Sequence, residues 1–315
     1  MNGTDRLKIF TGTAHPELVK ELCRELGQPL GSASIRRFPD GEIDVKIEDD
    51  IRGADVFIVQ PTCPPVNENL VELLILIDCA LRASADRITA VIPYYGYARK
   101  DRKDEGRVPI SAKLVANMIT RAGADRVLAI DLHASQIQGF FDIPVDHLYA
   151  KPVLVEYFET LELENPVVVA PDVGSIRMAR AYSQDLKAGL AIVDKRRQSP
   201  DHITAENLIG EVRGRDVVIV DDMITTAGSI TEAAKTVKRF DARRVFLGAT
   251  HGVLCANATE RLRSAPVEEI AVTNTIPLPP EKQFERLRQR TIAPLLARAI
   301  DRIHRRASVS ALFEK

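Results

Sequence analysis

Residues 217–229 read Val-Val-Ile-Val-Asp-Asp-Met-Ile-Thr-Thr-Ala-Gly-Ser. The first four form a continuous apolar run, which is typical of a strand buried on both faces of a sheet. Two carboxylates, Asp221 and Asp222, follow this run directly, and a loop of small residues then leads into a helical pattern over Ser229–Arg239. A buried strand that passes through a short loop into a helix predicts an α/β architecture with a parallel sheet.

Similar apolar runs recur along the chain and support the same architecture. Helical patterns lie between them, as in Glu68–Ala83 and Ser111–Ala122. The predicted buried strands are Val56–Val59, Ile88–Ile92, Val127–Ile130, Val167–Ala170, Leu190–Val193, Val217–Val220, Val245–Ala249 and Ile270–Val272. Alternating strands and helices predict mostly parallel sheets that are flanked by helices.

Two stretches of the sequence resemble each other. Residues 52–59 read Arg-Gly-Ala-Asp-Val-Phe-Ile-Val, and residues 213–220 read Arg-Gly-Arg-Asp-Val-Val-Ile-Val. Two halves of similar topology are the simplest explanation, and a chance match between Val-rich strands is the alternative. After the match, the first half continues with Gln-Pro-Thr-Cys-Pro-Pro where the second has the acidic loop. We therefore expect the chemistry mainly in the second half and where the halves meet.

The length of 315 residues predicts two domains. We place their boundary near Asp146–Lys151, which gives domains at residues 1–147 and 148–290. Residues 291–315 would form a C-terminal helix and tail that pack back on the first domain.

Composition excludes several classes of protein. The formal net charge of −1 disfavours a protein that coats nucleic acid. The four cysteines form no C-x-x-C pair, so no zinc or redox motif is visible. The N-terminus lacks the apolar stretch of a signal peptide, and the apolar segment Leu70–Leu81 is too short to span a bilayer. We expect a cytoplasmic protein with no membrane or nucleic-acid partner.

The loop after Val220 has the properties of an anion site. Backbone N–H groups at a helix N-terminus bind anions, and small side chains let a phosphate approach the backbone. Asp221 and Asp222 suit the paired hydroxyls of a ribose, because ionised carboxylates accept hydrogen bonds. The alternative for Ser229 is helix capping, since Ser229-Ile-Thr-Glu232 fits a capping box. The sequence contains neither a P-loop nor a Gly-x-Gly-x-x-Gly motif.

This loop resembles the phosphoribosyl-pyrophosphate loop of type I phosphoribosyltransferases. Its neighbours resemble one family with that fold, ribose-phosphate pyrophosphokinase, from Arg36-Arg-Phe-Pro-Asp-Gly-Glu42 to Ser308-Val-Ser-Ala-Leu-Phe313. The resemblance implies two phosphoribosyltransferase type I-like domains, ATP and ribose 5-phosphate as substrates, Mg²⁺ as cofactor, and a homo-hexamer. It also implies the reaction, in which the pyrophosphate of ATP moves to the anomeric hydroxyl of the sugar and AMP leaves.

The resemblance assigns two segments to ATP. Residues 38–42 alone would be a turn with Asp-Gly as its signal, but in the family this segment contacts adenine and ribose. Arg99 and Lys100 begin a densely charged stretch that would be a mobile lid over the phosphates, and the family usually has Gln at the position of Lys100. The ATP-binding residues implied are Phe38, Asp40, Gly41, Glu42, Arg99 and Lys100.

His133 and Asp172 match the positions that serve the metal of Mg-ATP in the family. Mg²⁺ prefers oxygen ligands, so Asp172 is the more natural ligand of the two. The family commonly has a second Gly at Ser175, which is a small change.

The segment Asp194-Lys-Arg-Arg197 matches the catalytic segment of the family. Lys195 would stabilise the charge that develops during transfer, and Arg197 would help to hold the sugar phosphate. The family usually has Asp where this chain has Thr225. The ribose 5-phosphate residues implied are Arg197, Asp221, Asp222, Thr225, Thr226, Ala227, Gly228 and Ser229.

A regulatory site for phosphate or ADP is implied by a further match, which is to the common phosphate-regulated class of the family. Many members have Asn where this chain has His147. The residues implied are Ser135, Asp146, His147, Ser308, Ser310 and Phe313.

Three alternatives remain at this point. A non-catalytic regulatory relative would have lost lid or catalytic cations, yet Arg99, Lys195 and Arg197 are present. A phosphoribosyltransferase that consumes the activated sugar would need only one such domain. An RNA-binding regulator on this scaffold is disfavoured by the net charge.

Overall fold

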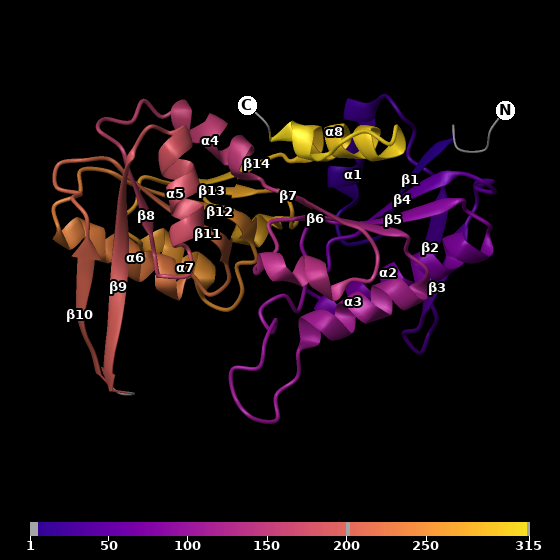
Figure 1. Ribbon diagram of the computed structural model, residues 1–315, viewed down its shortest axis with the longest axis horizontal. Helices are drawn as coiled ribbons and strands as arrows, with labels where there is room; N and C mark the ends of the chain where they lie inside the picture. Colours follow the sequence, from indigo (N-terminus) through magenta and orange to yellow (C-terminus); the bar gives the residue numbers. More distant parts are fainter. Residues whose placement is uncertain (1–5, 200–201, 314–315) are drawn as a thin grey trace. The chain divides into compact units, whose positions relative to one another are not determined.

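The computed structural model describes residues 6–199 and 202–313, and the side chains of residues 194–206 lie outside this description. The chain divides into two compact units. The first comprises Met1–Tyr149, Thr275–Pro277 and Ile292–Lys315, and the second comprises Ala150–Asn274 and Leu278–Thr291. Each unit has a parallel sheet with helices on both faces (Figure 1).

The first unit contains a five-stranded parallel sheet in the order β1-β4-β5-β6-β7. Its strands are β1 (Leu7–Thr11), β4 (Asp55–Val59), β5 (Arg87–Ile92), β6 (Arg126–Ile130) and β7 (Val145–Leu148), and a separate hairpin joins β2 (Ala33–Arg37) to β3 (Ile43–Ile47). Helices α1 (Pro16–Leu26) and α8 (Ala293–His304) pack together on one face, and α2 (Val66–Arg82) and α3 (Ser111–Ala122) lie on the other (Figure 1). Short 3₁₀ turns span Ser135–Phe140 and Ser310–Leu312.

The second unit contains a seven-stranded sheet in the order β10-β9-β8-β11-β12-β13-β14, parallel except for the β9–β10 hairpin. Its strands are β8 (Val167–Ala170), β9 (Gly189–Ser199), β10 (His202–Ile209), β11 (Val217–Ile224), β12 (Val245–Gly252), β13 (Glu269–Thr273) and β14 (Leu287–Arg290). Its helices are α4 (Lys151–Glu159), α5 (Ile176–Asp185), α6 (Gly228–Arg239) and α7 (Ala258–Ser264), with a 3₁₀ turn at Pro280–Lys282.

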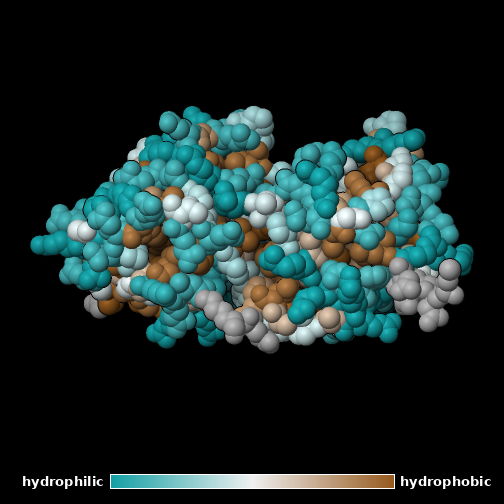
Figure 2. Space-filling view, turned by 90° about the horizontal axis from the view of Figure 1, so that it is seen from above, coloured by the Kyte–Doolittle hydropathy of each residue, from teal (hydrophilic) through white to brown (hydrophobic). Residues whose placement is uncertain are grey.

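The apolar runs form the buried centre of each sheet, as the sequence predicts. All five residues of β4 and all eight of β12 are buried, because helices cover both faces. Every predicted strand lies within an observed one, and the predicted helices coincide with α2, α3 and α6 to within two residues. Within the described ranges, no helix is long and apolar enough to cross a membrane, and the face in Figure 2 is mainly hydrophilic.

The two units repeat one topology, which confirms the prediction from the matching sequences. The order β1-β4-β5-β6-β7 of the first unit corresponds to β8-β11-β12-β13-β14 of the second. Before the matched strands, Gly53 has φ of 67° and Gly214 has φ of 68°, a region that glycine adopts without strain. Gly53 N donates to Ser84 O at 2.8 Å, and Gly214 N donates to Asp241 O at 2.8 Å.

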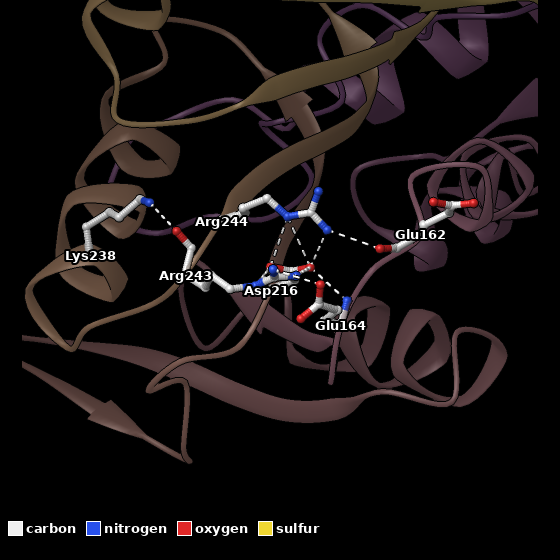
Figure 3. Close-up of polar contacts among 6 residues, drawn as sticks. All are labelled: Glu162, Glu164, Asp216, Lys238, Arg243 and Arg244. Atoms are coloured by element: carbon white, nitrogen blue, oxygen red, sulfur yellow. Dashed lines mark hydrogen bonds and ion pairs between the residues drawn. The ribbon is translucent and has the colours of Figure 1, made fainter.

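A buried aspartate begins the central strand of each unit and binds an arginine at the start of the next strand. Asp216 precedes β11, and its side chain is fully buried. Arg243 Nε and Arg244 NH2 donate to it at 2.9 and 2.6 Å (Figure 3). In the first unit, Arg87 Nε donates to Asp55 at 2.8 Å, and Asp55 also contacts His304 Nδ1 of α8 at 2.7 Å.

The arginines decide the charge state of Asp216. Burial alone would raise its pKa, but hydrogen bonds from Arg244 and Arg243 and from the backbone N–H of Glu164 lower the pKa to about 2. A carboxyl pKa that is lower in the folded chain stabilises the fold above the ordinary value near 4, and this contribution is lost as the pH falls through about 2. Asp216 is therefore an ionised residue that stabilises the second unit at neutral pH.

We expect Asp216→Asn to lower the free energy of unfolding by about 2–3 kcal/mol at pH 7. This is below the range for a fully buried pair, because both arginines keep contact with water. The matched control is Asp241→Asn, since the side chain of Asp241 is exposed and pairs with Arg213 at 3.7 Å, and we expect a change within about 0.5 kcal/mol. Urea denaturation measures both, and equal losses would contradict the assignment.

Candidate active site

The acidic pair lies inside the strand and not after it. β11 was expected to end at Val220 but continues to Ile224, because Asp221 pairs with Ala249 of β12 and Met223 with His251. Asp221 Oδ1 accepts from the backbone N–H of Asp222 at 3.0 Å. The carboxylates of Asp221 and Asp222 are thus fixed at the carboxyl end of the central strand, where open α/β sheets bind ligands.

The small-residue loop after Ile224 is held from behind by neighbouring segments. Thr225 O accepts from Cys255 N at 2.9 Å, and Thr226 O accepts from Arg261 NH1 at 3.1 Å. Ala227 has a left-handed backbone with φ of 61°. This conformation is unusual for a residue other than Gly, and such residues cluster at ligand sites.

The capping alternative for Ser229 is wrong. Ala227 is the N-cap of α6, and the helix begins at Gly228, so Ser229 already lies inside the first turn. No side chain caps this helix end. The first N–H groups of an α-helix have no partner within the helix, and such a helix start can bind a phosphate.

Asp172 joins the acidic pair through a serine. Asp172 lies in the loop between β8 and α5, and its Oδ1 accepts from both N and Oγ of Ser175 at 3.1 Å. Ser175 Oγ also lies 3.0 Å from Asp221 Oδ1. Sequence reasoning treated Ser175 as a small change, and no local pattern in the sequence could have revealed this contact across two strands.

The environment of Asp221 disfavours its negative charge. Burial raises the pKa of Asp221 most, and the neighbouring charges of Asp222 and Asp172 raise it further, to about 7. Hydrogen bonds from Ser175 and from the Asp222 backbone oppose this rise only in part. The acids Asp172, Asp221 and Asp222 lie at the carboxyl ends of β8 and β11, and their charges favour a ligand that brings positive charge or hydroxyl donors.

The equivalent place in the first unit is filled by the protein itself. Gln60 follows β4 as Asp221 follows Val220, and its Nε2 donates to Glu72 Oε1 at 2.8 Å. Thr13 Oγ1, after β1, donates to Glu72 Oε2 at 2.7 Å. Glu72 belongs to α2 and is only 2% exposed. This observation fits the expectation that the sugar chemistry belongs to the second half.

The catalytic candidates lie on β9. The backbone of Lys195 and Arg197 belongs to this strand, which pairs with β8 and β10. Both side chains fall outside the described part of the structure. β9 extends well past the predicted end at Val193, as one arm of the β9–β10 hairpin.

The residues assigned to adenine form the tip of the β2–β3 hairpin in the first unit. Phe38 N donates to Glu42 O at 2.8 Å, and Gly41, with φ of 95°, donates to Phe38 O at 2.9 Å. Asp40 Oδ1 accepts from Glu42 N at 3.1 Å. The tip is the predicted turn, and the ring of Phe38 is 51% exposed, so it can stack on a planar ligand.

The charged stretch from Arg99 to Arg107 is a long loop between β5 and α3, without helix or strand (Figure 1). Arg99 and Lys100 are exposed, and Lys100 Nζ pairs with Asp104 at 3.0 Å. Gln136 Nε2 donates to Asp101 at 2.7 Å. The loop therefore carries exposed cations that could reach a polyanion.

His133 is exposed and follows β6, whereas Asp172 is partly buried after β8 of the other unit. Among the described residues, no three His, Cys, Asp or Glu side chains are grouped to hold a metal ion. A cation here would need ligands from its substrate or from water, as is usual for Mg²⁺.

The regulatory candidates of the first unit include a connected aromatic group. The rings of His147 and Tyr149 contact each other at a tilt, with centroids 4.6 Å apart, and the ring of Tyr149 meets that of Phe313 edge-on at 5.7 Å. His147 Nε2 accepts from Leu132 N at 2.9 Å. Asp146 pairs with Arg126 at 2.6 Å. Ser135 begins a 3₁₀ turn, and Ser308 and Ser310 lie in the tail, where Ser310 begins the last turn.

Comparison with known proteins places this arrangement in a family. The family model described as the N-terminal domain of ribose phosphate pyrophosphokinase matches residues 7–123, and the phosphoribosyl synthetase-associated domain matches residues 197–314. Ribose-phosphate pyrophosphokinase of Rhodopirellula baltica is 56% identical over 312 residues, covering 98% of this chain and 99% of the relative. The chain belongs to the ribose-phosphate pyrophosphokinase family.

Other members of the ribose-phosphate pyrophosphokinase family agree in sequence and in fold. The Bacillus subtilis relative is 50% identical over 311 residues, covering 99% of this chain and 98% of that one. The crystal structure of phosphoribosylpyrophosphate synthetase from Mycobacterium smegmatis has a TM-score of 0.91 at 41% identity, covering 96% of this chain and all of that one. The predicted fold, with two phosphoribosyltransferase type I-like domains, and the predicted enzyme family are confirmed.

We expect trypsin to cut the native chain first between Arg99 and Arg107, because this loop is exposed and has few apolar contacts. Mg²⁺ with α,β-methylene ATP should slow this cut, and Mg²⁺ alone is the control. Mass spectrometry of the early fragments locates the site. First cleavage elsewhere, or equal rates in both conditions, would contradict a lid.

Proposed function

We propose that this chain transfers the pyrophosphate of ATP to the anomeric hydroxyl of ribose 5-phosphate, which yields 5-phosphoribosyl 1-pyrophosphate and AMP. The observation that carries the proposal is the acidic pair Asp221 and Asp222 on a central strand that leads straight into the uncapped start of α6. The family relationship extends over the whole chain and supports the same reaction.

The sugar phosphate is assigned to the second unit. Its phosphate would accept hydrogen bonds from the loop at Thr225–Ser229 and from the N–H groups that open α6. The ribose hydroxyls would donate to Asp221 and Asp222. Thr225 brings a hydroxyl donor and no charge, so its replacement of the usual family Asp removes one repulsion from the phosphate.

Mg²⁺ fits the residues that surround Asp172. Asp172 offers carboxylate oxygens, which Mg²⁺ prefers, and a cation would relieve the repulsion by which Asp222 and Asp172 contribute to the raised pKa of Asp221. Asp172 would hold the ion, and His133 is proposed as a second contact to the metal of the nucleotide. When bound, the ion would neutralise charge on the polyphosphate.

ATP is assigned to the first unit. Phe38 would stack on adenine, while Asp40 and Glu42 accept from amino or hydroxyl groups. Arg99 and Lys100 would reach the phosphates from the charged loop. A closed loop excludes water, which matters because water would otherwise compete with the sugar hydroxyl as the nucleophile.

Lys195 is proposed to stabilise the transition state. Transfer spreads negative charge over the oxygens of the moving group, and fixed cations stabilise that charge. Arg197 would hold the sugar phosphate from the same strand. We further propose that the protein acts in the cytoplasm as a homo-hexamer, without nucleic-acid or membrane partners.

The test of the reaction is a mixture of the full chain with ATP, Mg²⁺ and ribose 5-phosphate. We expect AMP to form in step with sugar consumption, because the bond that breaks lies between the α- and β-phosphates. Release of ADP would indicate a simple kinase, and no sugar-dependent turnover would favour a non-catalytic relative. Chromatographic separation of AMP from ADP decides between these outcomes.

Two variants separate catalysis from sugar binding. Lys195→Ala should lower kcat and kcat/KM equally, by about a hundredfold or more, because its contact forms in the transition state. Asp221→Ala should mainly raise KM for ribose 5-phosphate, since the ribose hydroxyls are present before and after transfer. Lys235→Ala is the matched control, because the exposed side chain of Lys235 pairs with Glu232 on the surface of α6.

Steady-state kinetics with folding checked by circular dichroism measures these effects. A kcat of Lys195→Ala within a few-fold of the parent would remove Lys195 from the catalytic assignment.

Phosphate and ADP are proposed to act at the group around His147 and Phe313. The aromatic contacts through Tyr149 join the tail to β7, so an anion bound there would order the tail. We expect activity to depend on phosphate concentration and ADP to oppose it. His147→Asn, which restores the residue of many relatives, should keep that dependence. Activity that is flat across both titrations would contradict the site.

A further inference from the structure

Ser175 occupies the point where the two assigned functions of the second unit meet. It immediately precedes α5, and only 9% of the residue is exposed. Its Oγ lies 3.1 Å from Asp172 Oδ1 and 3.0 Å from Asp221 Oδ1. The two acids come from different strands, β8 and β11, and Ser175 is the hydroxyl that connects them.

The hydrogen bonds of Ser175 and Asp222 engage Oδ1 of Asp172 and of Asp221, so that Oδ2 of each acid can bind a ligand. Asp172 Oδ1 accepts hydrogen bonds from N and Oγ of Ser175. Asp221 Oδ1 accepts hydrogen bonds from Ser175 Oγ and from Asp222 N. Among the described residues, the side-chain hydrogen bonds of both acids end on Oδ1. A carboxylate that is held by one oxygen has its rotamer fixed and presents the other oxygen to a substrate.

We propose that Ser175 is a positioning residue that orients Asp221 for the sugar hydroxyls and ties it to Asp172. The inference rests on the proposed function, and it concerns a residue that stands where the family commonly has Gly. A hydroxyl has one proton, so it donates to one of these carboxylates at a time. Whatever engages Asp172 therefore changes the hydrogen bond that Asp221 receives, which couples the two sites.

The predicted effect is on sugar affinity and not on the chemical step. Ser175→Ala removes the hydroxyl and leaves the backbone N–H on Asp172. A net hydrogen bond contributes about 1 kcal/mol, which corresponds to an affinity change of about fivefold. We expect KM for ribose 5-phosphate to rise by about fivefold with kcat within about twofold, because the contact persists through transfer.

The experiment adds a binding measurement that does not depend on turnover. Calorimetric titration of ribose 5-phosphate, with Mg²⁺ and α,β-methylene ATP present, should show the same fivefold rise in Kd for Ser175→Ala. Ser175→Thr keeps a hydroxyl and should remain within twofold of the parent. Ser183→Ala is the matched control, because Ser183 is in α5 of the same unit and its hydroxyl donates to Ala188 O at 2.7 Å, away from both acids.

The outcomes separate this inference from the proposed reaction. If the parent chain forms no AMP from ATP and ribose 5-phosphate, the proposed function fails. If the parent forms AMP but Ser175→Ala binds the sugar as the parent does, the positioning role is overturned. Equal losses in Ser175→Ala and Ser175→Thr would also overturn it, because the hydroxyl would then not be the cause. Loss only in Ser175→Ala supports it.

Discussion

The structure of each unit depends on a buried carboxylate that cannot move without losing its arginine. Asp216 at the start of β11 binds Arg243 and Arg244, and Asp55 at the start of β4 binds Arg87. Each pair joins the amino ends of two neighbouring parallel strands, so it helps to fix their register. A shift by one residue would turn every side chain of the strand to the other face and leave the aspartate unpaired. The position of Asp221, five residues further along β11, follows from the same constraint.

The carboxyl ends of the strands have the opposite character. At the amino ends, Asp216 and Asp55 each bind arginine, and the pKa of Asp216 is lowered to about 2. At the carboxyl end of β11, burial and neighbouring acids raise the pKa of Asp221 to about 7. The stabilising charge of Asp216 thus lies at the amino end of β11, and the disfavoured charge of Asp221 lies near its carboxyl end. A carboxyl group with a raised pKa of this kind is typical of a site that binds a ligand.

The sequence was sufficient for what depends on local pattern. Apolar runs predicted every central strand, and the match between residues 52–59 and 213–220 predicted the repeated topology. It could not predict what depends on contacts between distant segments. β11 continues past Val220 because β12 pairs with it, and Ser175 meets Asp221 because the loop after β8 lies beside the carboxyl end of β11. The strands β14 and β10 and the extension of β9 past Val193 were not predicted, since short or polar strands lack a strong periodic signal.

In the first unit, side chains of the protein occupy the place that corresponds to the acidic pair of the second unit. There Glu72 accepts hydrogen bonds from Thr13 and Gln60, as an internal substitute for a bound anion. This half therefore keeps the same strand order, but its own side chains satisfy the polar groups at this place. A sugar site in the first unit would require more than the exchange of Gln60 for an acid, because the new carboxylate would face Glu72. The two halves thus agree at the amino ends of their central strands, where each has a buried aspartate bound to arginine. They differ at the carboxyl ends, where one has Gln60 and the other Asp221.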